Sequence, residues 1–162
     1  MRAFKTARAP VFTRPANTTA YANGDLVANN TTAGSVVALA FGVAGAGGQG
    51  GKVTRVIIAK STTNLTNASF NLHLYAKAPT VTNGDNGAIA ANGYASNYLG
   101  VAAVTVDKAQ ADGALGYADV TIPFQCEPGV VEIYGLLEAT AAYTPGNAET
   151  IKVAIAVERS QL

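Results

Sequence analysis

This sequence of 162 residues contains very few of the side chains that carry out chemistry. It has one histidine, His73, one cysteine, Cys126, and no tryptophan. Charged residues make up 13% of the chain, well below the roughly 25% that is usual in globular proteins. A catalytic site needs several acidic, basic or nucleophilic groups in one place. The composition therefore favours a structural or interaction protein over an enzyme.

Other scarcities narrow the class of protein further. A single cysteine excludes an internal disulfide. The net charge of +1 argues against a nucleic-acid partner, because nucleic-acid-binding domains are clearly basic. The first ten residues, MRAFKTARAP, hold no apolar run long enough for a signal peptide, and no run in the chain approaches a membrane span. We expect no direct nucleic-acid binding and no membrane association.

The chain has instead a series of short alternating segments separated by turn signals. Asn-Gly or Pro-Gly pairs, which suit tight turns, occur at 23–24, 83–84, 92–93, 128–129 and 145–146. Between the turns, apolar and polar residues alternate with the period of a β-strand, most regularly over 151–157. The segments predicted to be strands are 11–14, 26–28, 35–44, 53–60, 70–75, 98–106, 120–124, 131–137 and 151–157.

This pattern predicts an all-β fold, a jelly-roll-like antiparallel β-sandwich of about 8–9 strands. Within the strand over 70–75, the period places Asn71, His73 and Tyr75 on the face opposite the apolar residues. Helix is expected only as one or two turns within 88–96. The long connection 78–97 is expected to be either a functional excursion or a flexible tip, because compact domains seldom carry such loops without a reason.

The charges are distributed unevenly, which suggests a division of the chain into two parts. Arg2, Lys5, Arg8 and Arg14 all precede the first acidic residue, Asp25. We expect an extended basic arm over 1–14 and a β-sandwich domain over 15–162. The arm is either a solvated terminus or a segment that lies on an acidic partner surface.

Three features of the sequence suggest nucleotide binding, metal binding or catalysis, but the residues around them do not support these functions. Gly45, Gly47 and Gly50 spell GxGxxG, but the dinucleotide fingerprint requires a helix next, and the segment that follows is a predicted strand. A lone strand histidine such as His73 is usually a hydrogen-bonding residue, and Cys126 is expected to be a small, partly buried apolar residue. An enzyme such as an esterase or a depolymerase, in which His73 and Cys126 would act together with an acid, is one alternative, and two non-enzymatic hypotheses follow below. We expect no cofactor, no metal and no catalytic residue.

Two stretches of the sequence form recognisable motifs. The first, 13–27, reads TRPANTTAYANGDLV. The second has a strand ending at Leu74-Tyr75, then Pro79-Thr80, then 85–88. In that order, and over about half of the chain, they resemble small structural proteins of tailed bacteriophages, in which an "RPADTTAYAAGDVV" stretch precedes a strand and a "PT…DNA" loop. The chain departs from this pattern at Tyr75, where phenylalanine is usual, and at the inserted Gly87.

Such proteins are similar to head decoration (cement) proteins. The resemblance implies a homotrimer on the outer surface of the virion head, assembled in the bacterial cytoplasm, that clamps the major capsid protein subunits. The expected contacts to the capsid or a sister subunit are arm residues and motif residues: Arg2, Phe4, Lys5, Arg8, Phe12, Arg14, Tyr21 and Asp25.

A second hypothesis is a tail or fibre sandwich that binds a host receptor or carbohydrate. It requires an exposed aromatic platform, because sugar rings stack on aromatic side chains. The tyrosines available for such a platform are Tyr75, Tyr94, Tyr98 and Tyr143.

Overall fold

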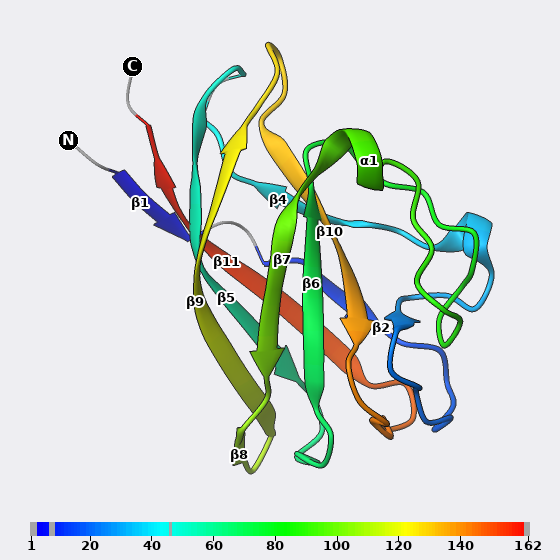
Figure 1. Cartoon of the computed structure of the whole chain (residues 1–162). Coiled ribbons are helices and arrows are strands. Elements are labelled where there is room, and N and C mark those ends of the chain that lie inside the picture. The colour runs from blue at the N-terminus through cyan, green and yellow to red at the C-terminus, as the bar shows by residue number, and fades with distance from the viewer. Residues whose placement is uncertain (1–2, 7–8, 46, 161–162) are drawn as a thin grey trace.

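The fold is described by a computed structural model, which covers residues 3–6, 9–45 and 47–160. Almost all of its regular structure is strand, as expected, and two antiparallel sheets pack face to face as a β-sandwich (Figure 1). The elements follow one another as β1 (Ala3–Thr6), β2 (Val11–Thr13), β3 (Asp25–Val27), β4 (Leu39–Gly42), β5 (Gly50–Lys60), β6 (Ser69–Tyr75), α1 (Tyr94–Asn97), β7 (Tyr98–Thr105), β8 (Lys108–Gln110), β9 (Gly113–Gln125), β10 (Glu132–Ala139) and β11 (Thr150–Arg159).

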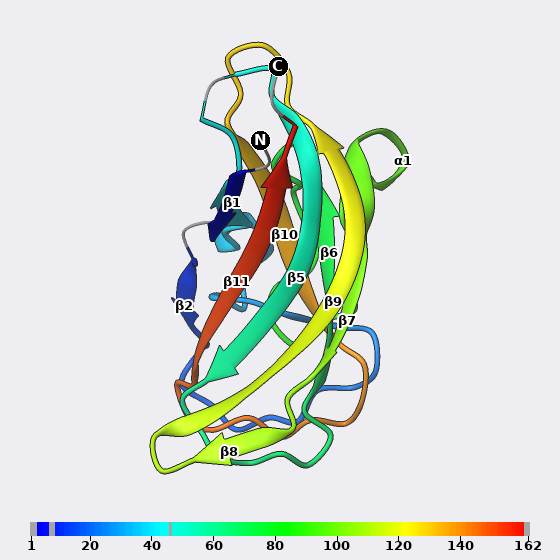
Figure 2. The same ribbon diagram turned by 90° about the vertical axis from the view of Figure 1, so that its left-hand side faces the viewer.

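Sheet A has the order β1-β11-β5-β9-β8, and β2 also pairs with β11. Sheet B has the order β3-β10-β6-β7, and β4 also pairs with β10. Figure 2 shows sheet A in front of sheet B. Most connections cross between the sheets: β2 to β3, β4 to β5, β5 to β6, β7 to β8, β9 to β10 and β10 to β11. Each sheet is therefore completed by strands that are distant in the sequence.

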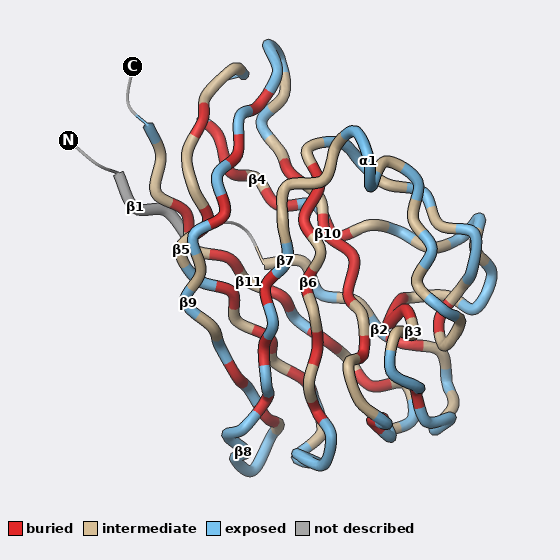
Figure 3. The backbone as a smooth tube through the Cα atoms, in the orientation of Figure 1, coloured by how far each residue is buried: buried red, intermediate tan, exposed pale blue. Residues whose placement is uncertain are grey.

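The main core lies between the sheets and follows the alternation in the sequence. In β11, Ile151, Val153, Ile155 and Val157 are fully buried, while the side chains between them face outward. In β6, Phe70, Leu72 and Leu74 face the core, and Asn71 and His73 face away from it. Figure 3 shows this alternation as short buried and less buried segments along each strand. Burying an aliphatic or aromatic side chain of this size contributes about 1.5–3 kcal/mol.

A second, smaller core covers the outer face of sheet B. Its fully buried members are Leu26, Ala28, Tyr75 and Leu136. Part of its cover comes from the connection 78–97, which is tied down by backbone hydrogen bonds from Leu26 N to Gly87 O (2.8 Å) and from Asp85 N to Asn30 O (2.7 Å). The connection is thus an ordered cover with a structural role, and not a free tip.

The prediction of one strand over 35–44 was wrong in its first half. Ala33–Ser35 form a 3-10 turn, and β4 begins only at Leu39. The Asn29 side chain donates to Ser35 O (3.1 Å) and accepts from Val37 N (2.9 Å). Because a side chain satisfies these backbone groups, the segment has no need of a strand partner. Val37 is consequently 70% exposed.

Strand β9 begins at Gly113, earlier than expected, and β1 and β8 were not predicted. The first two strands are part of sheet A, since both β1 and β2 pair with β11. The described part of the predicted arm is therefore extended, as expected, but it is held by the sheet. The single helical turn α1 lies at the end of the window in which one or two turns were expected.

The two sheets approach each other closely where β7 meets β9. A Cβ atom placed on Gly116 would lie 1.9 Å from the carbonyl oxygen of Thr105 and 2.7 Å from the Cα of Val106. Backbone atoms cannot yield as a flexible side chain can. Only glycine fits at this position, and its absence of a side chain lets the sandwich close along this side.

We predict that Gly116→Ala destabilises the fold by about 1–3 kcal/mol, because the added methyl group overpacks a backbone contact. Gly34→Ala is the control, since nothing lies within 4 Å of a Cβ at Gly34. Urea unfolding of the two variants measures the difference. Equal free energies of unfolding for both variants would contradict the close approach.

Candidate interaction site

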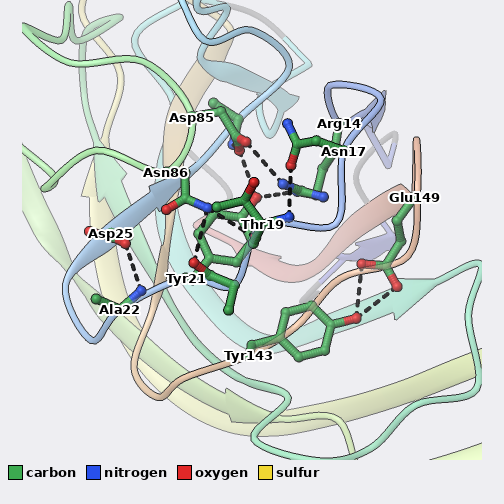
Figure 4. Close-up of polar contacts among 12 residues, drawn as sticks. Arg14, Asn17, Thr19, Tyr21, Ala22, Asp25, Asp85, Asn86, Tyr143 and Glu149 are labelled. Carbon is green, nitrogen blue, oxygen red and sulfur yellow. Dashed lines mark hydrogen bonds and ion pairs between the residues drawn. The ribbon is translucent and has the colours of Figure 1, made fainter.

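The centre of the N-terminal motif, residues 13–27, is a buried ion pair. Arg14, directly after β2, donates from Nη2 to Asp85 Oδ2 at 3.0 Å, and both side chains are fully buried. Tyr21 joins them: its hydroxyl accepts from Arg14 Nε and donates to Asp85 Oδ1 at 2.7 Å (Figure 4). The backbone N–H of Ala28 donates to the same oxygen at 2.8 Å. Three separate segments are joined at one carboxylate.

The surroundings of Tyr21 are those of an interior residue. Its side chain is 2% exposed, and burial together with the neighbouring Asp85 carboxylate raises the pKa of its hydroxyl. Its ring lies parallel to that of Tyr143, with centroids 6.5 Å apart. The hydroxyl therefore remains protonated, and a hydrogen-bond donor, at neutral pH.

The two sequence motifs meet at this site. Asn86 donates from its side chain to Thr19 O (3.0 Å) and Ala20 O (3.2 Å), across 67 and 66 residues of sequence. Within the first motif, Asp25 Oδ2 accepts from Ala22 N at 2.6 Å. Segments 13–27 and 85–88 thus form one packed unit (Figure 4).

This arrangement corrects part of the predicted contact set. The side chains of Arg14 and Tyr21 are buried and bonded within the chain, so they position the motif and do not contact a partner in this fold. Phe12 is partly buried against the main core, and Asp25 begins β3. Phe4 and Lys5 lie on β1, and Arg2 and Arg8 lie outside the described residues. For these six, a role in contacts stays a prediction.

A second buried polar cluster was missed at the sequence level. Glu149 accepts from the Tyr143 hydroxyl at 2.7 Å and lies 3.6 Å from Lys60 Nζ, and the Lys60 and Glu149 side chains are fully buried. Lys60 also donates to Thr62 O at 2.9 Å. Burial lowers the pKa of Lys60, and the Glu149 carboxylate opposes that shift. The alternation of side chains along the strand could have revealed this cluster, because it places Lys60 on the same face as the buried Val56 and Ile58.

An apolar groove lies between the edges of the two sheets, and we call it the edge groove. It has a volume of about 310 Å³. Within the described part of the chain, neither β2 nor β4 pairs with a strand on its outer side. Val11 and Val37 stand at the groove with 60% and 70% of their surface exposed. The residues that line it are Pro10, Val11, Phe12, Asn29, Val37, Ala38, Leu39 and Ala40.

The two residues considered for catalysis lie in different environments. His73 is on the outer face of sheet B, where Nε2 contacts Glu138 Oε2 at 2.6 Å and Nδ1 contacts the Tyr98 hydroxyl at 2.9 Å. Cys126 is buried in the main core, where burial raises the pKa of its thiol. The structure does not bring the two together.

The glycine-rich segment 47–50 packs closely against another part of the backbone. A Cβ on Gly47 would lie 2.1 Å from the backbone nitrogen of Gly129. Gly50 begins strand β5, so no helix follows the GxGxxG pattern. Of the four tyrosines proposed as an exposed platform, Tyr143 is buried in the main core and Tyr75 in the smaller core. Tyr94, on α1, is exposed, and its ring contacts that of Tyr98 on β7.

Within residues 3–6, 9–45 and 47–160, no three His, Cys, Asp or Glu side chains gather in a way that would hold a metal ion. No helix there has the length and hydropathy required to span a bilayer.

Comparison with known proteins gave no match: no family model fits the chain, and neither the curated proteins nor the solved structures contain a match.

We predict that Asp85→Ala destabilises the protein by about 3–5 kcal/mol, because it leaves the Arg14 charge buried without a partner. The double variant Arg14→Met/Asp85→Ala should lose no more than the single variant, since it removes the uncompensated charge as well. Chemical denaturation of the wild-type protein, of Arg14→Met, of Asp85→Ala and of the double variant measures the coupling.

The control is Asp107→Ala, which breaks an exposed ion pair with Lys108 and should change stability little. If Asp85→Ala behaved like Asp107→Ala, or if the effects of the two substitutions were additive, the buried pair would not be the anchor of the motif.

Proposed function

We propose that this chain is a non-enzymatic structural protein of a tailed-bacteriophage virion, a decoration (cement) protein that binds the outer surface of the head. Its partner would be the major capsid protein, whose adjacent subunits it would hold together. The motifs that resemble such proteins support this proposal, and their residues form one packed unit around Arg14 and Asp85. Because these residues hold the fold together, the resemblance of the motifs supports a shared fold with such proteins.

The order of the strands also supports the proposal. Taken without the short β1, β3 and β8, the order β2-β11-β5-β9 faces β4-β10-β6-β7. This order supports an eight-stranded jelly roll, an architecture frequent in viral capsid proteins and lectins. We therefore keep the jelly roll as part of the proposal.

The observation that carries the proposed docking is the edge groove. Strands with unpaired outer edges accept a further strand from a neighbour, and natural monomers usually cover or charge such edges. Here the groove is apolar, and Val11 and Val37 project at it. An extended segment of a capsid subunit or of a sister subunit would pair with β2 or β4 and cover both valines.

A homotrimer is the proposed working unit on the capsid. Each edge groove alone would give a weak contact. Three grooves in one assembly would act together, because the first contact raises the effective concentration of the other two. A head surface with many identical sites suits this mode of binding, and it needs no bond-making chemistry from the chain.

We predict that Val11→Asp/Val37→Asp reduces occupancy on expanded heads that lack the chain by tenfold or more, since it places two charges in an apolar contact. The control is Val101→Asp, at an exposed position on β7, distant from the groove in sheet order. Cryo-electron microscopy of the reconstituted heads measures occupancy. Full occupancy by the groove variant, or equal loss in both variants, would overturn the proposed docking edge.

A second variant tests the arm separately. Deletion of residues 1–9 removes β1 and leaves β2 and Arg14 in place. If the arm contacts the shell or a sister subunit, occupancy falls while the melting temperature of the free protein changes little. Unchanged occupancy on the same heads would reject a role for the arm.

A further inference from the structure

A small pocket lies on the outer face of sheet B, where the connection 78–97 and α1 meet β6. It is lined by His73, Tyr75, Ile89, Ala91 and Tyr94, and its volume is about 210 Å³. Pockets for drug-sized ligands usually measure about 300–1,000 Å³. The space therefore suits a ligand the size of a single ring.

One wall of the pocket is aromatic and partly open. Tyr94, on α1, is 60% exposed. Its ring lies 4.4 Å from that of Tyr98, and Tyr98 in turn makes an edge contact with Tyr75 at 5.4 Å. Tyr98 thus supports Tyr94 from one side and holds it in place. A supported, exposed ring offers a flat surface to a ligand at little cost in side-chain entropy.

The polar groups of the pocket are set by the hydrogen bonds around His73. Its two ring nitrogens contact Glu138 and Tyr98, and Asn71 also donates to Glu138 Oε2, at 3.1 Å. The imidazole is held in one orientation by these contacts.

The tyrosine hydroxyls remain available for a ligand. Burial raises the pKa of Tyr98 to about 12 and also raises that of Tyr75, so both hydroxyls are protonated at neutral pH. Among the described residues, none forms a hydrogen bond with the hydroxyl of Tyr75 or Tyr94. The hydroxyl of Tyr94, which is 60% exposed, and that of Tyr75, which is 1% exposed and lines the pocket, therefore have hydrogen-bonding capacity that the fold itself does not use.

Charge selects among the possible ligands. No lysine or arginine lines the pocket, and the Glu138 carboxylate lies directly behind His73. An anionic ligand such as a phosphate or an acidic sugar would meet a negative group with no compensating cation. A purely apolar ligand would leave the tyrosine hydroxyls without partners. A neutral ring with one apolar face and several hydroxyls satisfies both conditions.

We propose that this pocket binds one neutral pyranose ring of a cell-surface or environmental glycan. The C–H face of the sugar would pack on the ring of Tyr94, and its hydroxyls would bond to the hydroxyl of Tyr75 at the pocket wall. The site is separate from the edge groove, and it does not depend on a capsid role. On a particle that carries many copies, weak single sites would add up to firm attachment.

The test is a titration of the isotope-labelled full chain, followed by NMR, with methyl glycosides of glucose, galactose, mannose and N-acetylglucosamine. At least one of these neutral sugars should shift signals confined to β6, α1 and the segment 78–97. N-acetylneuraminic acid, which is anionic, should bind more weakly. No saturable shifts with any neutral sugar, or an equal affinity for the acidic sugar, would overturn the proposal.

Two variants locate the site. Tyr94→Ala should weaken binding of the responding sugar about five- to tenfold, because it removes the stacking surface, whereas Tyr94→Phe should retain most of it. Tyr117→Ala is the matched control, since Tyr117 is 47% exposed on β9 in the other sheet. Binding that survives Tyr94→Ala, or that falls equally in Tyr117→Ala, would show a non-specific contact and overturn the assignment. Because Tyr94 is exposed, its variants should keep the wild-type spectrum elsewhere.

Discussion

The ion pair between Arg14 and Asp85 is the constraint on which the irregular part of this molecule depends. Both side chains are withdrawn from water, and a buried charge that loses its partner costs several kcal/mol. The pair is therefore formed only when the chain after β2 and the connection 78–97 are both in their native places. Tyr21 and the backbone N–H of Ala28 bond to the same carboxylate and extend the constraint to β3.

Both proposed surfaces are built outward from this anchor. On the arginine side, the chain leads back to β2 and to the edge groove. On the aspartate side, the connection carries Ile89, Ala91 and Tyr94, which form the pocket over His73. A long loop without such an anchor would be mobile and would define neither wall of a pocket. The buried pair of Arg14 and Asp85 thus positions the segments that form the edge groove and the pocket.

Several of the few charged residues of this chain are buried and hold its segments together. Of the few charged residues, Arg14, Lys60, Asp85 and Glu149 are buried, and they form ion pairs with one another and hydrogen bonds with neighbouring groups. The outer surface is therefore even less charged than the composition suggests. Such a surface is easily desolvated, which favours extensive contacts with neighbouring molecules in an assembly.

The sequence by itself determined the all-β class, most of the strands and the inward faces of β6 and β11, because alternation is a local property that each strand carries alone. It did not reveal that 36–38 leave the strand, because a side chain of Asn29 replaces the pairing. Only the tertiary structure decided that Asp85 meets Arg14 across 71 residues, and that three of the tyrosines converge while Tyr143 does not. Those partners are set by the crossing of the strands between two sheets, and no local period encodes which distant segments become neighbours.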